Sequence, residues 1–538
     1  MNISGKIVDP HLKTIYKGRL NIQDGKIISI EKKDHVEDVY IFPGMVDSHV
    51  HIESSMLTPR NFAKLALKHG TIAVIADPHE IANVMGKEGI EYMISDAKNN
   101  PFKFYFGIPS CVPATPFENS GGHIDSADVA QLLAKNEVVC LAEMMNFPGV
   151  LNKDPEVIAK LSAAAKFNKP VDGHAPGLSG AELLAYIEAG ISTDHEAVSI
   201  KEAEEKIQKG MIIQIREGSA AKDFDTLIPL ISKYPDRLMF CTDDSHPDTL
   251  QQQHILDLVR RGINLGFKLF DLLQAAILTP KEHYNLPIGT LQINDPADFI
   301  VLKDLKDFHV QDVYIDGVSI REDKSKEPAI MQTSFNRFNA QAINLNMLKV
   351  KNEGDRIRVI KAKDRELYTK QSIQTTDFGS PYVESDTSRD ILKLIVLNRY
   401  HQAKPQVAFI SGFGLKRGAI ASSIAHDSHN IIALGADDKS IVQAVNRLIE
   451  IKGGLAVCSN GECSSMQLEI AGLMSNKMPD KLIETYLDLK NKAKELGCIQ
   501  QSPFMTLSFM ALPVIPELKL TDTGLFDVNT MTFTELFV

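Results

Sequence analysis

Two histidines spaced two residues apart, His49 and His51, close an apolar stretch that begins at Phe42. In an extended strand this spacing places both imidazoles on the same face. Adjacent imidazoles are the start of a metal site, because neutral imidazole is a common ligand of divalent transition metals. An isolated His-x-His pair is also compatible with ordinary surface or core histidines. The residues at the ends of the other predicted strands therefore distinguish the two interpretations.

Seven further apolar runs of strand length follow, and segments with helical periodicity separate most of them. The runs are Thr71–Ala76, Phe104–Ile108, Val138–Ala142, Val171–Gly173, Gly190–Thr193, Met211–Ile215 and Leu238–Thr242. Eight β/α units over residues 46–284 predict an α/β fold with a (β/α)8 TIM barrel. A doubly wound parallel sheet is the alternative, but it does not explain where the polar residues fall.

Strand-like runs also stand on both sides of the barrel segment, in residues 1–45 and 285–330. Within the first, Asp24-Gly25 lies between alternating apolar runs, which is a hairpin signal. Two β-rich pieces around a long α/β stretch predict one small β-sandwich domain built from both flanks of the barrel.

The last third of the chain repeats the α/β pattern and predicts an additional C-terminal α/β domain at 340–538. The segment Lys324–Phe335 lacks clear periodicity and is interpreted as the connector. A chain of 538 residues is too long for one hydrophobic core, so several domains are expected.

Composition excludes several classes of partner. The formal net charge is -11 and no cluster of Lys and Arg occurs, so we expect no nucleic-acid partner. No signal peptide or membrane span is evident, so we expect a cytoplasmic protein with no membrane partner. Six cysteines are scattered without a framework, and we expect small buried groups rather than disulfides.

Catalytic residues of a (β/α)8 barrel gather at the C-terminal ends of its strands. Seven of the eight predicted strands end in imidazoles or charged groups, and only the third does not. These groups are His49 and His51; Asp77, His79 and Glu80; Glu143; His174; Asp194, His195 and Glu196; Arg216 and Glu217; and Asp243 and Asp244. Such a set is hard to place except around metal.

The run Pro43-Gly44-Met45-Val46-Asp47-Ser48-His49-Val50-His51, with His, His and Asp at later strand ends, resembles the amidohydrolase superfamily of metal-dependent hydrolases and deaminases. Within it, the strand-end motifs resemble the adenine deaminase family; these motifs occupy residues 77–80, 143–146, 173–177, 194–196, 214–219 and 242–244. Residues 411–419 and 426–430 are similar to that family's C-terminal domain. The resemblance covers essentially the whole chain.

The resemblance implies a binuclear divalent metal site, with manganese or iron expected and zinc as the alternative. It implies one metal held by His49, His51, Glu143 and Asp243, and a second held by Glu143, His174 and His195. Many two-metal relatives bridge the metals with a carboxylated lysine at the end of the fourth strand. Glu143 stands there instead, and its two oxygens can span two cations.

The implied activity is hydrolytic deamination of free adenine at C6, by a metal-activated hydroxide, to hypoxanthine and ammonia in purine salvage. Asp243 is the expected proton shuttle, with Asp244 as a neighbouring or substrate contact. The candidate donors to the purine N1 are Glu80, Glu196 and Glu217, and the sequence does not choose among them.

Several roles stay open at this stage. His79 and Arg216 are expected to contact substrate, with structural roles given equal weight. His426 and His429 are interpreted as surface histidines, with a place over the barrel mouth as the alternative. A homo-oligomer, dimer or higher, is expected. The competing functions are another amidohydrolase-type deaminase or cyclic amidohydrolase, and a non-catalytic scaffold.

Overall fold

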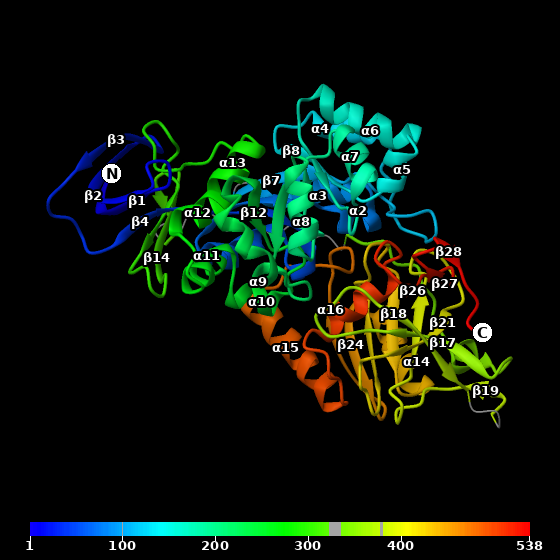
Figure 1. Cartoon of the computed structure of the whole chain (residues 1–538). Helices are drawn as coiled ribbons and strands as arrows, with labels where there is room; N and C mark the ends of the chain where they lie inside the picture. Colours follow the sequence, from blue (N-terminus) through cyan, green and yellow to red (C-terminus); the bar gives the residue numbers. More distant parts are fainter. Residues whose placement is uncertain (99, 322–334, 377–379) are drawn as a thin grey trace.

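The computed structural model describes residues 1–98, 100–321, 335–376 and 380–538. A sheet containing the N-terminus lies beside a central barrel, and a second large sheet lies on the other side of it (Figure 1). The connector predicted at 324–335 falls, except for Phe335, outside the described residues. Within these ranges, no helix has both the length and the apolar character to cross a membrane.

The central region is an α/β TIM-like domain built on two parallel sheets. The first comprises β5 (Met45–Val50), β6 (Thr71–Ala76), β7 (Lys103–Ile108), β8 (Val138–Met144) and β9 (Val171–Gly173). The second comprises β10 (Thr193–Asp194), β11 (Ile212–Arg216) and β12 (Leu238–Cys241). Their near-continuous apolar runs are buried on both faces, as parallel strands require.

Two short connections close these sheets into a ring. A parallel bridge between Val171 and Ile191 joins β9 to the segment before β10. At the other end, the amide of His51 donates to the Asp243 carbonyl (3.1 Å), and the amide of Asp243 donates to the His49 carbonyl (3.0 Å). Closure therefore brings the first and last strand ends, with their expected ligands, side by side.

Helices surround the ring in the order expected for a barrel (Figure 1). They are α1 (Pro59–Ala66), α2 (His79–Met85), α3 (Lys87–Ala97), α4 (Ser126–Leu133), α5 (Phe147–Leu151), α6 (Pro155–Lys166), α7 (Gly180–Glu188), α8 (Ile200–Gln208), α9 (Phe224–Leu227), α10 (Pro247–Gln252), α11 (Ile255–Asn264), α12 (Leu269–Leu273) and α13 (Thr279–His283). The run predicted as a strand from Gly190 begins later, at Thr193, because Gly190 belongs to the turn that follows α7 and has a φ of +104°.

The seven-stranded sheet has the order β15-β14-β13-β4-β1-β2-β3. Its strands are β1 (Asn2–Asp9), β2 (Thr14–Gln23), β3 (Lys26–Lys32), β4 (Tyr40–Pro43), β13 (Phe299–Leu302), β14 (Val310–Ile315) and β15 (Val318–Ser319). β4 pairs antiparallel with β13, so the sheet draws on both flanks of the barrel. β4 leads directly into β5, which ties this sheet to the strand that carries His49.

The C-terminal region contains an eight-stranded sheet in the order β18-β17-β21-β20-β23-β22-β24-β25. Its strands are β17 (Arg356–Lys361), β18 (Lys370–Thr375), β20 (Leu392–Leu397), β21 (Gln406–Ser411), β22 (Ala419–Ser422), β23 (Ile431–Gly435), β24 (Gly454–Ser459) and β25 (Glu462–Gln467). The accompanying helices are α14 (Asp438–Glu450), α15 (Pro479–Glu495) and α16 (Pro503–Ser508), and β16 (Val350–Lys351), β19 (Tyr382–Val383), β26 (Leu518–Leu520), β27 (Leu525–Asp527) and β28 (Thr532–Phe533) form two smaller sheets. Within the large sheet, β17 and β21 pair in parallel, whereas the other neighbouring strands pair antiparallel.

One expectation about cysteines is wrong. Cys458 on β24 and Cys463 on β25 are directly opposed in a hairpin and form a disulfide. Their spacing was too wide for a Cys-x-x-Cys site, but hairpin register, rather than spacing along the chain, brought the two sulfurs together. The other four cysteines are free and buried, as expected.

Candidate metal centre and active site

The two histidines of β5 point to one place at its C-terminal end. Their Nε2 atoms are 3.2 Å apart, and both side chains are buried. The Oδ1 atom of Asp243, which follows β12, lies 3.0 Å from the Nε2 atom of His51. The expected first ligand group therefore converges across the closing strands of the barrel.

Glu143, at the end of β8, faces two sets of imidazoles with its two oxygens. Its Oε1 atom lies 3.4 Å from His51 Nε2 and 3.7 Å from His49 Nε2. Its Oε2 atom lies 2.7 Å from His174 Nδ1 and 3.3 Å from His195 Nε2. One carboxylate thus stands between two groups of nitrogen ligands, which is the geometry that a bridging ligand needs.

These residues fit a divalent metal by their chemistry and by their convergence. His49, His195 and Asp243 form one group of potential ligands, and Glu143, His174 and His195 form another, each with its ligand atoms within 4.8 Å of one another. The Nε2 atom of His174 is buried and makes no hydrogen bond to any described residue. A buried set of imidazoles and carboxylates suits manganese, iron and zinc.

Arg216, at the end of β11, is surrounded by carboxylates. Its guanidinium contacts Glu196, Asp223 Oδ2 (3.1 Å) and Asp243 Oδ2 (3.1 Å). Burial lowers the pKa of Arg216, but these carboxylates outweigh burial and hold it well above its usual value. The side chain is therefore a fixed cation that orients Glu196 and Asp243.

Asp243 and Asp244 meet different environments although they are adjacent. Burial opposes ionisation of Asp243, but the hydrogen bond from His51 and the charges of His195 and Arg216 hold its pKa well below the usual range. Burial raises the pKa of Asp244, whose Oδ1 accepts a 2.5 Å hydrogen bond from Ser54. Their environments therefore give the two carboxyls opposite tendencies to ionise.

The C-terminal region completes the pocket, and the interpretation of His426 and His429 as surface histidines is wrong. Both are 1% exposed, and both contact Glu80 at the start of α2. His426 Nδ1 hydrogen-bonds to Glu80 Oε1, and His429 Nε2 lies against Glu80 Oε2. The amide of Ala425 donates to His429 Nδ1 (3.2 Å), so the proton of His429 is on Nε2 and faces Glu80.

Glu80 is consequently a carboxylate that joins the barrel and the C-terminal region inside the pocket. Burial raises its pKa, but the imidazoles of His426, His429 and His79 outweigh burial and hold the pKa well below its usual range. His426 also lies 3.9 Å, by its Nε2 atom, from Asp244 Oδ1. One imidazole therefore reaches both the second and the eighth strand ends.

His79 and Glu217 were both expected at the site, but only His79 lies in the pocket. His79 lies inside the pocket, with Nδ1 3.1 Å from Asp77 Oδ2 and 3.3 Å from Glu143 Oε1. Glu217 lies outside it, because its Oε1 atom pairs with Arg261 Nη1 at 2.8 Å. The strand alternation explains this difference: Arg216 points inward, and its neighbour Glu217 points to a surrounding helix.

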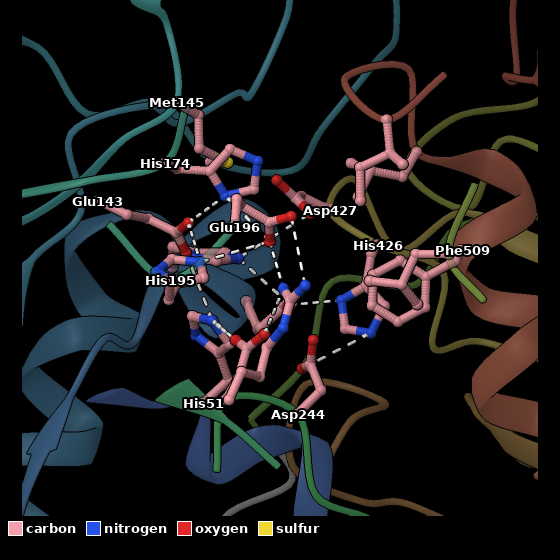
Figure 2. A pocket seen from close by; sticks show the side chains of 17 residues that line it. His51, Glu143, Met145, His174, His195, Glu196, Asp244, His426, Asp427 and Phe509 are labelled. Atoms are coloured by element: carbon pink, nitrogen blue, oxygen red, sulfur yellow. Dashed lines mark hydrogen bonds and ion pairs between the residues drawn. The ribbon is translucent and has the colours of Figure 1, made fainter. Parts of the chain in front are cut away.

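The pocket includes residues that strand-end motifs did not indicate (Figure 2). In this view His174 and Glu143 stand on one side, and His426 and Phe509 stand on the other. The additional lining residues are Leu367, Asp427, Phe509, Leu512 and Ile515. Asp427 lies inside the His426-to-His429 motif and could have been found from it. The apolar residues carry no comparable signal.

A buried lysine supports the loops that carry His174 and His195. Lys206 on α8 is fully buried, and its Nζ donates to Asp194 Oδ2 and to the Ala175 carbonyl, both at 2.8 Å. Asp194 in turn accepts from the Ala175 amide through Oδ1 (2.9 Å). This network ties the end of β9 to the end of β10.

We expect Lys206→Met to lower the free energy of unfolding by about 3–5 kcal/mol, because it leaves the Asp194 carboxylate buried without its cation. Urea unfolding would measure the change. Lys201→Met is the matched control, since Lys201 is exposed on the same helix. Equal stability of the two variants would contradict the prediction.

A barrel of parallel strands whose ends carry converging imidazoles and carboxylates is the architecture of metal-dependent hydrolases of the amidohydrolase class. The family model for the amidohydrolase family matches residues 40–320, and the model for the adenine deaminase C-terminal domain matches residues 366–532. The chain belongs to the amidohydrolase family and, within it, to the adenine deaminases.

Two adenine deaminases support this placement over the full length. The chain is 52% identical over 543 residues to an adenine deaminase of Methanosarcina barkeri, covering 99% of this chain and 98% of the relative. It is 48% identical to an adenine deaminase of Salinibacter ruber, covering 100% and 99%. A solved N-acetyl-D-glucosamine-6-phosphate deacetylase from Mycobacterium smegmatis matches 60% of this chain and 99% of its own, at 14% identity and a TM-score of 0.46.

Proposed function

We propose that this protein deaminates free adenine at C6 by hydrolysis, releasing hypoxanthine and ammonia for purine salvage. The observation that carries the proposal is the convergence of Glu143 with four histidines and Asp243 at the barrel mouth, in a chain of the adenine deaminase family. A scaffold without activity would have no need to keep this whole set of ligands buried and aligned.

The proposed site would hold two divalent cations, manganese or iron, with zinc as the alternative. His49, His51, Glu143 and Asp243 would hold one, and Glu143, His174 and His195 would hold the other. The two-sided contacts of Glu143 support its role as the bridge. When bound, the cations would lower the pKa of a water and supply a nucleophile near neutral pH.

Asp243 is the proposed proton acceptor and donor. Its Oδ1 atom faces His51, while Arg216 holds Oδ2 in place. A carboxylate fixed in this way can accept a proton from the attacking water and deliver it to the leaving amino group, because ammonia leaves only after protonation. Asp244, next to His426, is proposed as a neighbouring contact that helps to orient substrate.

Glu80 is the proposed partner of the purine N1. Of the three candidate carboxylates, Glu196 is engaged by Arg216, and Glu217 lies outside the pocket. Glu80 lines the pocket and shares its carboxylate with His426 and His429. His426 and Glu80 together can hold and deliver a proton to the ring nitrogen as electron density builds there.

The finer architecture is also a proposal. We propose residues 1–45 and 285–330 as one small domain of β-sandwich type, and 340–538 as a C-terminal α/β domain. β13 from the second flank pairs with β4 from the first flank, and this pairing supports a single small domain built from both flanks. We further propose a cytoplasmic homo-oligomer, dimer or larger. Light scattering on the purified protein would measure its mass in solution, and the mass of one chain would contradict the proposed oligomer.

Metal analysis combined with ammonia release from adenine tests the function. We expect close to two metals per chain, ammonia from adenine, and none from adenosine or cytosine. Dialysis against a chelator should abolish release, and manganese or iron should restore it.

Two outcomes would redirect the proposal. Metals without ammonia release from adenine would favour another deaminase or a cyclic amidohydrolase, with substrates sought among other heterocycles. Release that survives complete metal removal would contradict the metal-dependent mechanism.

A further inference from the structure

Besides Met145, the apolar residues that line the pocket are Leu367, Phe509, Leu512 and Ile515, which are called the apolar wall below. All four side chains are buried, between 1% and 6% exposed. In Figure 2, Phe509 lies across the pocket from His174 and Glu143. A flat heterocycle has apolar faces and a hydrogen-bonding edge, so it suits a pocket lined by both apolar and polar side chains.

The wall comes from two segments far apart in the sequence. Leu367 lies in the connection between β17 and β18, whereas Phe509 begins a single 3₁₀ turn (Phe509–Ala511) after α16. Leu512 and Ile515 follow that turn in irregular chain. Neither segment is held by a long helix or by a central strand at these positions, so specific contacts must set the distance between them.

Lys519 supplies such a contact. It lies on β26 and is fully buried, and its Nζ donates to the Leu367 carbonyl (3.0 Å) and to the Phe509 carbonyl (2.9 Å). Thr369 adds a second connection, because its Oγ1 donates to the Leu518 carbonyl at 2.9 Å. The side chain of Lys519 therefore joins the main chain of one wall segment to the main chain of the other.

The environment of Lys519 is costly for an amine. Burial lowers the pKa of Lys519 to about 7. Among the described residues, both hydrogen-bond partners of its Nζ are carbonyl oxygens, and a buried cation without a counter-charge is unfavourable. Even an uncharged amine has two N–H bonds, one for each carbonyl, so the connection does not depend on the charge. This residue is thus matched to the task of holding two carbonyls.

We propose that Lys519 is a positioning residue for substrate: by holding the main chain of Leu367 and Phe509, it sets the apolar wall against which the adenine ring packs. The inference rests on the proposed function. Lys519 does not line the pocket and acts only through the wall. Its removal should therefore weaken binding of the purine more than it slows the chemical step.

Lys519→Met keeps the length and apolar body of the side chain and removes both N–H donors. We expect the KM for adenine to rise about tenfold with kcat within about threefold. The inhibition constant of unsubstituted purine, which has no amino group to lose, should rise in parallel. Metal content should stay at the value of the unaltered chain. Lys519→Gln retains two N–H donors, so its KM should lie between those of the unaltered chain and Lys519→Met.

Lys393→Met is the matched control. Lys393 is also buried in the C-terminal region, where its Nζ donates to the Leu348 carbonyl (3.0 Å) and to Asp438 Oδ1 (2.6 Å). Neither partner lines the pocket. We expect this variant to lose stability without a change in KM. Leu512→Ala keeps the lysine and shortens the wall itself, and it should raise KM as Lys519→Met does.

Each outcome decides a different point. An unchanged KM and purine inhibition constant in folded Lys519→Met would overturn the role of Lys519 while leaving the deaminase proposal intact. If Lys519→Met fails to fold, Lys519→Gln and Leu512→Ala take its place, and an unchanged KM in both would overturn the wall. Absence of ammonia release from adenine by the unaltered chain would overturn the proposed function and this inference with it.

Discussion

Glu143→Gln should lose bound metal and activity together, with kcat/KM lower by more than about 100-fold. Residues that only orient metal ligands commonly cost about 10–100-fold when removed, and Glu143 itself faces both ligand groups through its two oxygens. An amide offers one oxygen and an N–H donor, so it cannot present an anionic oxygen to each side. Metal analysis and steady-state kinetics on the same preparation would measure the two losses.

Glu217→Gln is the control for this experiment. Glu217 is buried and belongs to the same set of strand-end carboxylates, but it pairs with Arg261 outside the pocket. We expect it to keep the metal content of the unaltered chain. Full metal content and full activity in Glu143→Gln would contradict the assignment of Glu143 as the bridging ligand.

Glu80→Gln should lower kcat by about 10²–10⁴-fold while its metal content stays at that of the unaltered chain. This is the range for removal of a general acid or base. The carboxylate of Glu80 accepts from His426 and faces the protonated Nε2 of His429. In Glu80→Gln, the side-chain NH2 group would face an N–H donor of His426 or His429, so one of these two contacts would be lost. Kinetics with adenine, read beside metal content, separate this loss from the one expected for Glu143.

Glu88→Gln is the matched control for Glu80. Glu88 is an exposed carboxylate at the start of α3, directly after the helix that carries Glu80. A Glu80→Gln protein with the kcat of this control would remove Glu80 from the mechanism. A protein that had lost its metals would instead move Glu80 among the groups that hold them.

The strand ends of the barrel were predictable because they depend on local pattern. β6 and β9 have the predicted bounds, and the others differ by a few residues at most. Parallel strands in a barrel are buried on both faces, so they appear as apolar runs, and their polar neighbours mark the rim. The convergence of His49, His51 and Glu143 follows from that topology together with the family resemblance.

Contacts between distant segments were not predictable in the same way. The burial of His426 and His429 against Glu80 depends on how the C-terminal region docks on the barrel. The pairing of Cys458 with Cys463 depends on hairpin register. Neither docking nor register leaves a periodic signal in the residues themselves, so the local pattern favoured surface histidines and unpaired thiols.

By itself, then, the amino-acid sequence determined the barrel, the imidazoles and carboxylates at its strand ends and the family, since apolar periodicity and short motifs are properties of neighbouring residues. Tertiary structure alone decided that Glu217 faces Arg261, that Glu80 is shared with His426, and that Lys519 joins the two wall segments. These last facts are set by packing between segments up to several hundred residues apart. Such packing is determined by the whole chain at once and by no stretch of it alone.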